Sequence, residues 1–290
     1  MAMSLDPTLQ EPPDLLALTA RIDRTLDAFL TGAREEMAAA AADALLPIDE
    51  VIRLIESGGK RLRPTFCYWG YRAAGGVEGE PIERAAAALE LLHTMALIHD
   101  DLMDRSPARR GEPASRFQLA DRARLRGSSD PEHAGTALAL LAGDLAAVLA
   151  DRLLLTSGFE PGALLSALDR YHRMRTDMAL GQCLDVAGGD ADAAVTAGLK
   201  GGSYTVEGPL LIGAALAEGN AAVSAALAAY GTPLGLAFQL LDDERDGEAT
   251  LDAGRVAGLV DQARAALDVT CLDTEAVRAL STLADLVAAG

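Results

Sequence analysis

The sequence predicts an all-α fold, a single-domain bundle of roughly ten or more helices. Half of its 290 residues are apolar, but only 4% are aromatic. Ala and Leu carry most of the apolar share and both favour helices, whereas strands recruit β-branched and aromatic residues. From about residue 14 onward apolar positions recur at helical spacing, and no segment alternates as a strand would.

The expected helices follow from apolar runs and the breaks between them. The first runs are LLALTARIDRTLDAFL, IDEVIRLIE and IERAAAALELLHTMALIHDDLMD. Gly and Pro clusters mark the breaks in chain order: SGGKRLRP, AAGGVEGEP, RRGEP, RGSSDPEHAG, TSGFEPG, VAGGDADA and YGTP. Residues 1–13, with three prolines, are expected to be a disordered lead-in. Residues 14–290 are expected to form one domain, because no long linker divides them.

The charge pattern excludes one class of partner. The net charge of −18 argues against nucleic acid, since a phosphate backbone needs a basic surface. Only two of the 25 basic residues are lysines, Lys60 and Lys200. Lys60 and Lys200 are therefore candidate functional residues, although drift in composition could also leave two lysines by chance.

The sequence favours a cytoplasmic protein. Cys67, Cys183 and Cys271 are scattered and lack CxxC spacing, so neither a disulfide framework nor a zinc site is expected. The first residues, MAMSLDPTLQEPPD, lack the basic and apolar regions of a signal peptide. The longest apolar stretch, around residues 134–155, is broken by charged side chains, and we expect no transmembrane segment.

The stretch LLHTMALIHDDLMD ends an apolar helix in three carboxylates, Asp100, Asp101 and Asp104. Asp100 and Asp104 are four residues apart and share one helix face, with His93 on nearly the same face. Carboxylates at the mouth of an apolar stripe need a cation, and Mg²⁺ with oxygen ligands suits them. A solvated helix end, or an N-cap for the next helix, is the alternative.

A second acidic end, LAFQLLDDERD, repeats this design with Asp242, Asp243 and Asp246. Two such clusters predict two helices that face each other with Mg²⁺ ions between them. A diphosphate is the natural guest, because metal ions bridge its oxygens and neutralise its charge.

Two basic segments support an anionic ligand. GGKRLRP places Lys60, Arg61 and Arg63 behind two glycines that permit close backbone approach. ARRG places Arg109 and Arg110 just after the first acidic cluster. Arginine offers a planar fork to phosphate and lysine a point charge. Each segment alone also fits a solvated turn, but beside a metal–diphosphate site both favour phosphate binding.

These motifs together resemble the trans-type polyprenyl diphosphate synthases, in particular geranylgeranyl diphosphate synthases. They are GGKRLRP, HDDLMD followed by RRG, GQCLD at 181–185, KGGSYTVEGPL at 200–210 and FQLLDDERD at 238–246, in that order. The resemblance extends from roughly residue 40 to the end of the chain. It implies the isoprenoid synthase type I fold around a central apolar cavity, and a homodimer.

The resemblance also implies roles for individual residues. Three Mg²⁺ ions would be held by six aspartates: Asp100, Asp101, Asp104, Asp242, Asp243 and Asp246. The allylic diphosphate would contact Arg109 and Lys200. Isopentenyl diphosphate would bind Lys60, Arg63, His93 and Arg110. Thr205, Gln239, Gln182 and Asp185 match positions that line the site.

The implied reaction joins isopentenyl diphosphate head-to-tail to dimethylallyl, geranyl or farnesyl diphosphate. Mg²⁺ stabilises the departing diphosphate, the allylic C–O bond ionises, the isopentenyl double bond attacks C1, and a proton is lost. Catalysis would depend on Asp100, Asp101, Asp104, Asp242 and Lys200. An apolar cavity below the aspartates would exclude water, which would quench the cation, and accept the growing tail.

Product length depends on what blocks that cavity. At ~1.5 Å per residue, Ala96 and Met95 lie about 6 and 7.5 Å below Asp100 and would form the wall. Bulky aromatics at these positions accompany shorter products in the family. Their absence here implies a product longer than C15, most simply C20 geranylgeranyl diphosphate.

Three departures from the family pattern keep two alternatives open. After DDERD the chain runs directly into GEATLDAGRVAGLVDQ, where the family usually has a GK-type motif and a further Asp. ASRF stands where Thr-x-His is frequent, and Gly201 where Thr is common. One alternative is a non-catalytic partner subunit that tunes an active synthase. The other is a class I terpene cyclase, although the second DDxxD, Lys60 and Arg63 argue against it.

Overall fold

The computed structural model describes residues 13–188, 198–245 and 252–288 of the chain. Helices make up nearly all of these residues, and the only sheet among them is a pair of two-residue strands. The all-α class expected from composition and periodicity is therefore confirmed. The expected lead-in falls almost wholly in residues 1–12, which lie outside the described residues.

The chain forms two compact units. The first contains residues 13–61 and 83–157, and the second contains residues 62–82 and the described residues from 158 onward. The long helix α4 (Glu80–Met103) begins in the second unit and runs through the first. A single domain spanning 14–290 stays a prediction.

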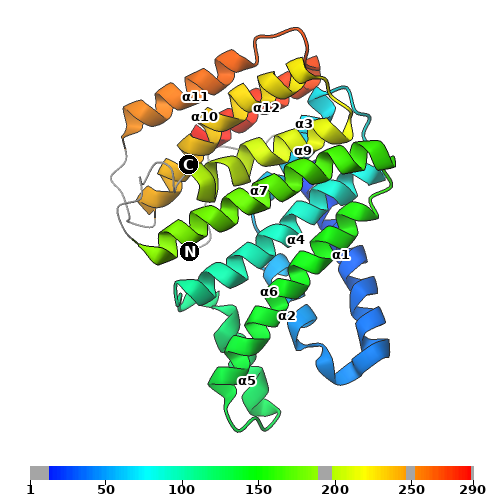
Figure 1. Cartoon of the computed structure of the whole chain (residues 1–290), viewed down its shortest axis with the longest axis vertical. Helices are drawn as coiled ribbons and strands as arrows, with labels where there is room; N and C mark the ends of the chain where they lie inside the picture. The colour runs from blue at the N-terminus through cyan, green and yellow to red at the C-terminus, as the bar shows by residue number, and fades with distance from the viewer. Residues whose placement is uncertain (1–12, 189–197, 246–251, 289–290) are drawn as a thin grey trace. The chain divides into compact units, whose positions relative to one another are not determined.

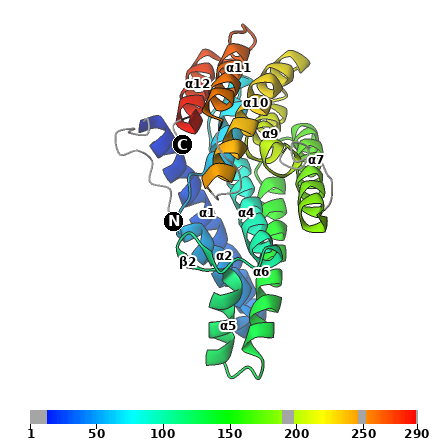
Figure 2. The same cartoon turned by 90° about the vertical axis from the view of Figure 1, so that its left-hand side faces the viewer.

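The first unit is built on helices α1, α2, α4, α5 and α6. Besides α4, the elements of this unit are α1 (Pro13–Ala41), η1 (Ala42–Ala44), α2 (Leu46–Glu56), β1 (Ala108–Arg109), β2 (Glu112–Pro113), α5 (Ser115–Leu125) and α6 (Pro131–Leu155). Leu18, Ile22, Leu26 and Leu30 recur every fourth residue along α1 and are buried, which is the apolar stripe of a core-facing helix. Helices α5 and α6 pack side by side (Figure 2).

The second unit contains the remaining helices. They are α3 (Leu62–Ala73), α7 (Pro161–Ala187), the π-helical segment η2 (Gly198–Glu207), α9 (Gly208–Leu216), α10 (Ala221–Arg245), α11 (Ala253–Ala266) and α12 (Thr274–Ala288). Helices α10, α11 and α12 pack against one another (Figure 1). Helices α3 and α9 approach so closely that a Cβ at Gly213 would overlap the Cys67 carbonyl oxygen. Only glycine permits this contact.

Helix α10 corrects one expected break. YGTP was expected to end a helix, but α10 runs through Pro233. Tyr230, Leu234 and Ala237, on both sides of the proline, are buried, and the Tyr230 hydroxyl donates to the Leu280 carbonyl at 2.7 Å. Burial and this hydrogen bond offset the roughly 3 kcal/mol that a proline costs inside a helix.

Helix α10 is also the described helix that most resembles a membrane span. Among the described helices, only α10 has the length and hydropathy of a membrane span, and 44% of that window is buried inside the structure. Within the second unit, helix α10 packs against η2, α9, α11 and α12.

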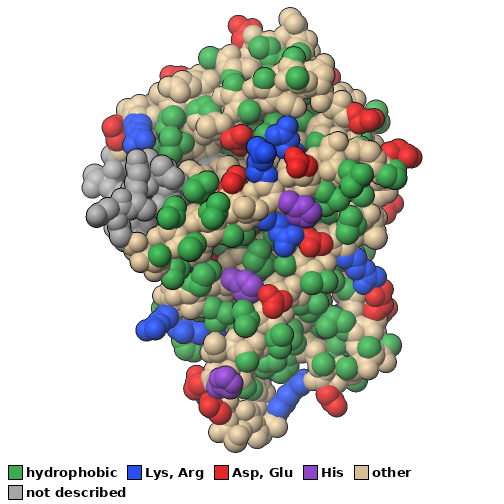
Figure 3. Space-filling view, viewed as in Figure 1, with side chains coloured by type: hydrophobic (Ala, Val, Ile, Leu, Met, Phe, Trp, Pro, Cys, Tyr) green, Lys and Arg blue, Asp and Glu red, His purple; other side chains and the backbone are tan. Residues whose placement is uncertain are grey.

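On the described part of the face in Figure 3, acidic and basic side chains lie interspersed among apolar ones. The expectation that nucleic acid is not a partner stays a prediction.

Candidate functional site

The first acidic cluster lies where helix α4 ends. Asp100 and Asp101 belong to its last turn, and the Asp104 N–H donates to the Asp100 carbonyl at 2.8 Å just beyond it. Asp104 is exposed, whereas Asp101 is only 3% exposed. The helix thus carries one carboxylate into the protein and leaves another in solvent.

A short hairpin brings Arg109 to this cluster. Strands β1 and β2 are joined by Arg110 and Gly111, which have φ values of 54° and 81°. Positive φ at both loop residues is the signature of a type I′ turn, which suits the twist of a two-residue hairpin. The RRG motif therefore sets the position of Arg109 at the end of β1.

Arg109 binds both carboxylates at the helix end. Its Nε and Nη2 donate to Asp101 Oδ1 at 3.0 and 2.6 Å, and Nη2 donates to Asp100 Oδ2 at 3.2 Å. Burial raises the pKa of Asp101 above its ordinary value, and the Arg109 guanidinium only partly counteracts this. The end of α4 is therefore a charge-compensated group whose geometry is already set.

Arg110 points to a different element. Its Nη1 donates to the Leu54 carbonyl at 3.1 Å, to Ser57 Oγ at 3.2 Å and to the Gly58 carbonyl. These acceptors lie at the end of α2, where a helix leaves carbonyl groups without intrahelical partners and favours a cation. Lys60 is half-buried in the loop that follows.

The remaining predicted residues of the first unit lie along α4. His93 and Ala96 are half-buried, and Met95 is 9% exposed. All three precede the acidic cluster by one to two turns, as expected from the sequence.

The second acidic cluster ends helix α10. Asp242 and Asp243 lie in its last turn and are half-buried. Gln239 Nε2 donates to Asp243 Oδ1 at 2.6 Å, and Arg245 Nη1 lies 3.9 Å from Asp242 Oδ1. Asp246 lies outside the described residues. That the two acidic clusters face each other stays a prediction, since they belong to different units.

In the second unit, two predicted site residues come together. Arg63 Nη2 donates to Thr205 Oγ1 at 2.9 Å, and its guanidinium lies 4.5 Å from the centroid of the Tyr204 ring. Thr205 and Tyr204 belong to η2, and π-helical turns are frequent at functional sites. The sequence motifs assigned Tyr204 no role in the site, and its position next to Thr205, a predicted site-lining residue, was the available signal. Lys200 belongs to η2, but its side chain lies outside the described residues.

The acidic ends of α4 and α10 offer carboxylate oxygens, which suit a hard cation. Asp100, Asp101 and Asp104 supply carboxylate oxygens within about one turn, which is what Mg²⁺ prefers. Across the described residues, no three acidic, His or Cys side chains converge as a metal site. Here Arg109 compensates Asp100 and Asp101, and Asp104 is exposed. The carboxylate oxygens of these residues suit Mg²⁺. For the three carboxylates to converge on one ion, Arg109 would have to exchange Asp100 and Asp101 for other partners.

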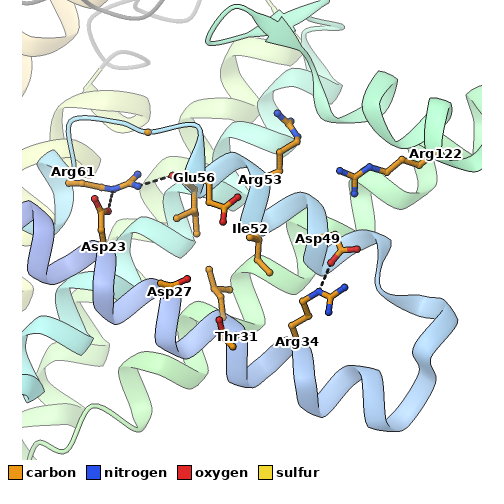
Figure 4. Close-up of a pocket in the computed structure, with 13 residues that line it drawn as sticks. Asp23, Asp27, Thr31, Arg34, Asp49, Ile52, Arg53, Glu56, Arg61 and Arg122 are labelled. Carbon is orange, nitrogen blue, oxygen red and sulfur yellow. Dashed lines mark hydrogen bonds and ion pairs between the residues drawn. The ribbon is translucent and has the colours of Figure 1, made fainter.

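A separate polar cavity opens in the first unit between α1 and α2. Its volume is about 660 Å³, and charged side chains of both signs line it, among them Asp23, Arg34, Asp49, Arg53 and Arg61 (Figure 4). Such a lining does not suit a hydrocarbon tail, so this cavity is distinct from the apolar one expected below the aspartates.

Comparison with known sequences identifies similar proteins. The profile of the family described as Polyprenyl synthetase matches residues 48–257, a range that contains every predicted site residue. The geranylgeranyl diphosphate synthase of Methanosarcina mazei is 32% identical over 232 residues, which are 76% of this chain and 67% of that protein. The (2E,6E)-farnesyl diphosphate synthase of Mycobacterium bovis is 35% identical over 199 residues. That match covers 64% of this chain and 48% of the relative, so the chain spans about half to two thirds of these curated relatives.

Comparison with solved structures gives the same fold. The crystal structure of geranylgeranyl pyrophosphate synthase from Corynebacterium glutamicum, complexed with isoprenyl diphosphate and magnesium, superposes with a TM-score of 0.86. The two sequences are 25% identical, and the match covers 99% of each chain. The isoprenoid synthase type I fold expected from the motifs is therefore confirmed.

Proposed function

The chain belongs to the polyprenyl synthetase family, and on that premise we propose that it is a Mg²⁺-dependent trans-prenyltransferase. The match of the Polyprenyl synthetase family to residues 48–257 confirms the family expected from the sequence motifs. The proposed reaction joins isopentenyl diphosphate head-to-tail to an allylic diphosphate. The observation that carries it is the end of α4, where Arg109 holds Asp100 and Asp101 together.

Six aspartates are proposed to hold three Mg²⁺ ions: Asp100, Asp101, Asp104, Asp242, Asp243 and Asp246. Bound Mg²⁺ would supply electrostatic stabilisation of the diphosphate leaving group. Arg109 would exchange its carboxylate partners for oxygens of the allylic diphosphate, to which a planar guanidinium donates equally well. Lys200 would add a second cation to the same group.

The isopentenyl diphosphate would bind four basic residues, Lys60, Arg63, His93 and Arg110. Arg63 is already oriented by Thr205 and by the Tyr204 ring, which limits the side-chain entropy lost on binding. Gln239, close to the second acidic cluster, would contact the substrate bound at that cluster. These residues would bind and orient charge, and the proposed apolar cavity would exclude water from the carbocation.

The product is proposed to be C20 geranylgeranyl diphosphate. Met95 is buried in α4 one turn before the aspartates, with Ala96 beside it. An unbranched methionine and a small alanine leave room that an aromatic side chain would fill. A cytoplasmic homodimer without a nucleic-acid partner completes the proposal.

The deciding experiment incubates the purified chain with labelled isopentenyl diphosphate, Mg²⁺ and each allylic primer in turn. Products are dephosphorylated and resolved by chain length. We expect a C20 product that disappears with a chelator and returns with added Mg²⁺. No elongation unless a partner protein is added would favour the non-catalytic subunit. Hydrocarbon in an organic overlay would favour the terpene cyclase.

A further inference from the structure

Arg61 is a buried cation of the GGKRLRP motif to which the proposed reaction assigns no contact with a substrate. It is 4% exposed and lies between Lys60 and helix α3. Its Nε donates to Asp23 Oδ1 at 2.8 Å (Figure 4), Nη1 to Glu90 Oε1 at 2.7 Å, and Nη2 to the Ile55 carbonyl at 2.8 Å. One guanidinium thus joins α1, α4 and the end of α2.

The conformation and the burial of Arg61 are both energetically unfavourable. Its φ of 50° is in the left-handed region, which is unfavourable for a non-glycine residue. A buried guanidinium also loses its hydration, and only close partners with good geometry offset this. Burial acts to lower the pKa of Arg61, but Glu90 and Asp23 outweigh it and raise the pKa. Such a residue persists where its surroundings determine its conformation.

The segment that Arg61 anchors is the loop of residues 57–60. From the other side, Arg110 donates to Ser57 Oγ and to the Gly58 carbonyl. Gly59 lies between the two arginines, because a Cβ there would be 2.9 Å from Arg110 Nη2 and 3.2 Å from Arg61 Nη1. The loop is therefore held between two guanidinium groups.

We propose that Arg61 is a positioning residue that, with Glu90, fixes the loop of residues 57–60 and so orients Lys60 and Arg110 toward a diphosphate. This inference rests on the proposed function for the identity of the substrate, isopentenyl diphosphate. Arg61 does not touch the substrate. It shapes the backbone from which Lys60 projects and with which Arg110 bonds.

The main test is Arg61→Lys, which keeps the charge but cannot reach three acceptors in a planar fork. We expect KM for isopentenyl diphosphate to rise about tenfold, since small misplacements of binding groups have effects of this size or more. KM for the allylic diphosphate and kcat should change little. A rise in both KM values, or in neither, would overturn the proposal.

Arg34→Lys is the matched control. Arg34 also belongs to α1–α2 packing, with its Nε 2.7 Å from Asp49 Oδ1, but it lies outside the loop. The same substitution there should leave both KM values unchanged. A lower melting temperature and a smaller active fraction with unchanged KM in Arg61→Lys would identify a merely structural residue and overturn the proposal.

Two further variants keep the inference testable if Arg61→Lys does not fold. Glu90→Gln removes the negative charge of the buried partner, and Asp23→Asn removes that of a partner whose side chain is 48% exposed. Exposed ion pairs contribute less than buried ones. We therefore expect the larger rise in KM for isopentenyl diphosphate from Glu90→Gln, and equal effects or the reverse order would count against the proposal.

A binding measurement separates this inference from the proposed function. Inorganic diphosphate is titrated calorimetrically into the wild type and the variants without Mg²⁺, so that the carboxylate-dependent site does not contribute. If the wild type elongates no primer, the proposed function fails. The positioning role then depends on this titration alone: about tenfold weaker binding in Arg61→Lys supports it, and unchanged binding overturns it.

Discussion

The two acidic clusters end apolar helices with the same spacing, but they differ in what holds them. At the end of α4, Asp101 is buried and Arg109 reaches it from a hairpin eight residues further along the chain. At the end of α10, the contacts described for Asp242 and Asp243 come from Arg245 and Gln239 on the same helix.

This difference shows that one motif can be built with two degrees of preorganisation. The α4 cluster has its geometry set by a second element before any ligand binds. In the α10 cluster, Gln239 contacts Asp243 and Arg245 contacts Asp242 within one helix, and such i,i+4 and i,i+3 contacts are weak.

The largest expected effect comes from removing one carboxylate of each cluster. Asp100→Asn should lower kcat about 10³-fold, and Asp242→Asn should lower it less, because preorganised charges contribute most to stabilising a transition state. Steady-state kinetics with saturating substrates measures both. Asp268→Asn, at an exposed position after α11, serves as the control. A greater loss at Asp242 would break the comparison.

The next effect concerns stability. Arg109→Gln leaves the buried Asp101 carboxylate without its cation, and we expect the free energy of unfolding to fall by about 3 kcal/mol. Arg245→Gln in the other cluster should lower it by less than about 0.5 kcal/mol, since that pair is longer and more exposed. Denaturant unfolding of both variants gives the two values. Similar losses would mean that the clusters are held alike.

The comparison extends to the apolar run before the first cluster. On the proposed function, Met95→Phe should shorten the main product from C20 to C15, because the ring would fill the cavity proposed below the aspartates. Met103→Phe, on the same helix but at an exposed position, should leave the product unchanged. Chain-length analysis of the dephosphorylated products distinguishes them, and an unchanged product from Met95→Phe would discredit this wall.

The smallest effect is a pH dependence specific to Asp101. Since burial raises its pKa in the folded state, the folded protein retains this proton to a higher pH than the unfolded chain. The contribution to stability therefore falls as pH rises from the ordinary aspartate value through the raised one. Carboxyl ¹³C NMR should show a titration above the ordinary range that Asp101→Asn removes. A titration at or below the ordinary value would show that Arg109 outweighs burial.

Local pattern was sufficient for much of this molecule. Periodic Ala and Leu predicted the helices, and the spacing within DDLMD predicted an acidic end on α4. The RRG motif placed two arginines close after it, and only the hairpin showed that they point to different elements. YGTP misled, because Pro233 predicts a break locally while the burial of Tyr230 and Leu234 favours a continuous helix.

By itself the sequence determined the helical class, the family motifs and the acidic helix ends, because each depends on residues within a few turns of one another. Only the tertiary structure decided which partners the basic residues have. Arg61 meets Asp23 and Glu90 across 38 and 29 residues, and Arg63 meets Thr205 across 142. Such pairings depend on how helices pack, and packing is set by buried surfaces from distant parts of the chain that no local pattern encodes.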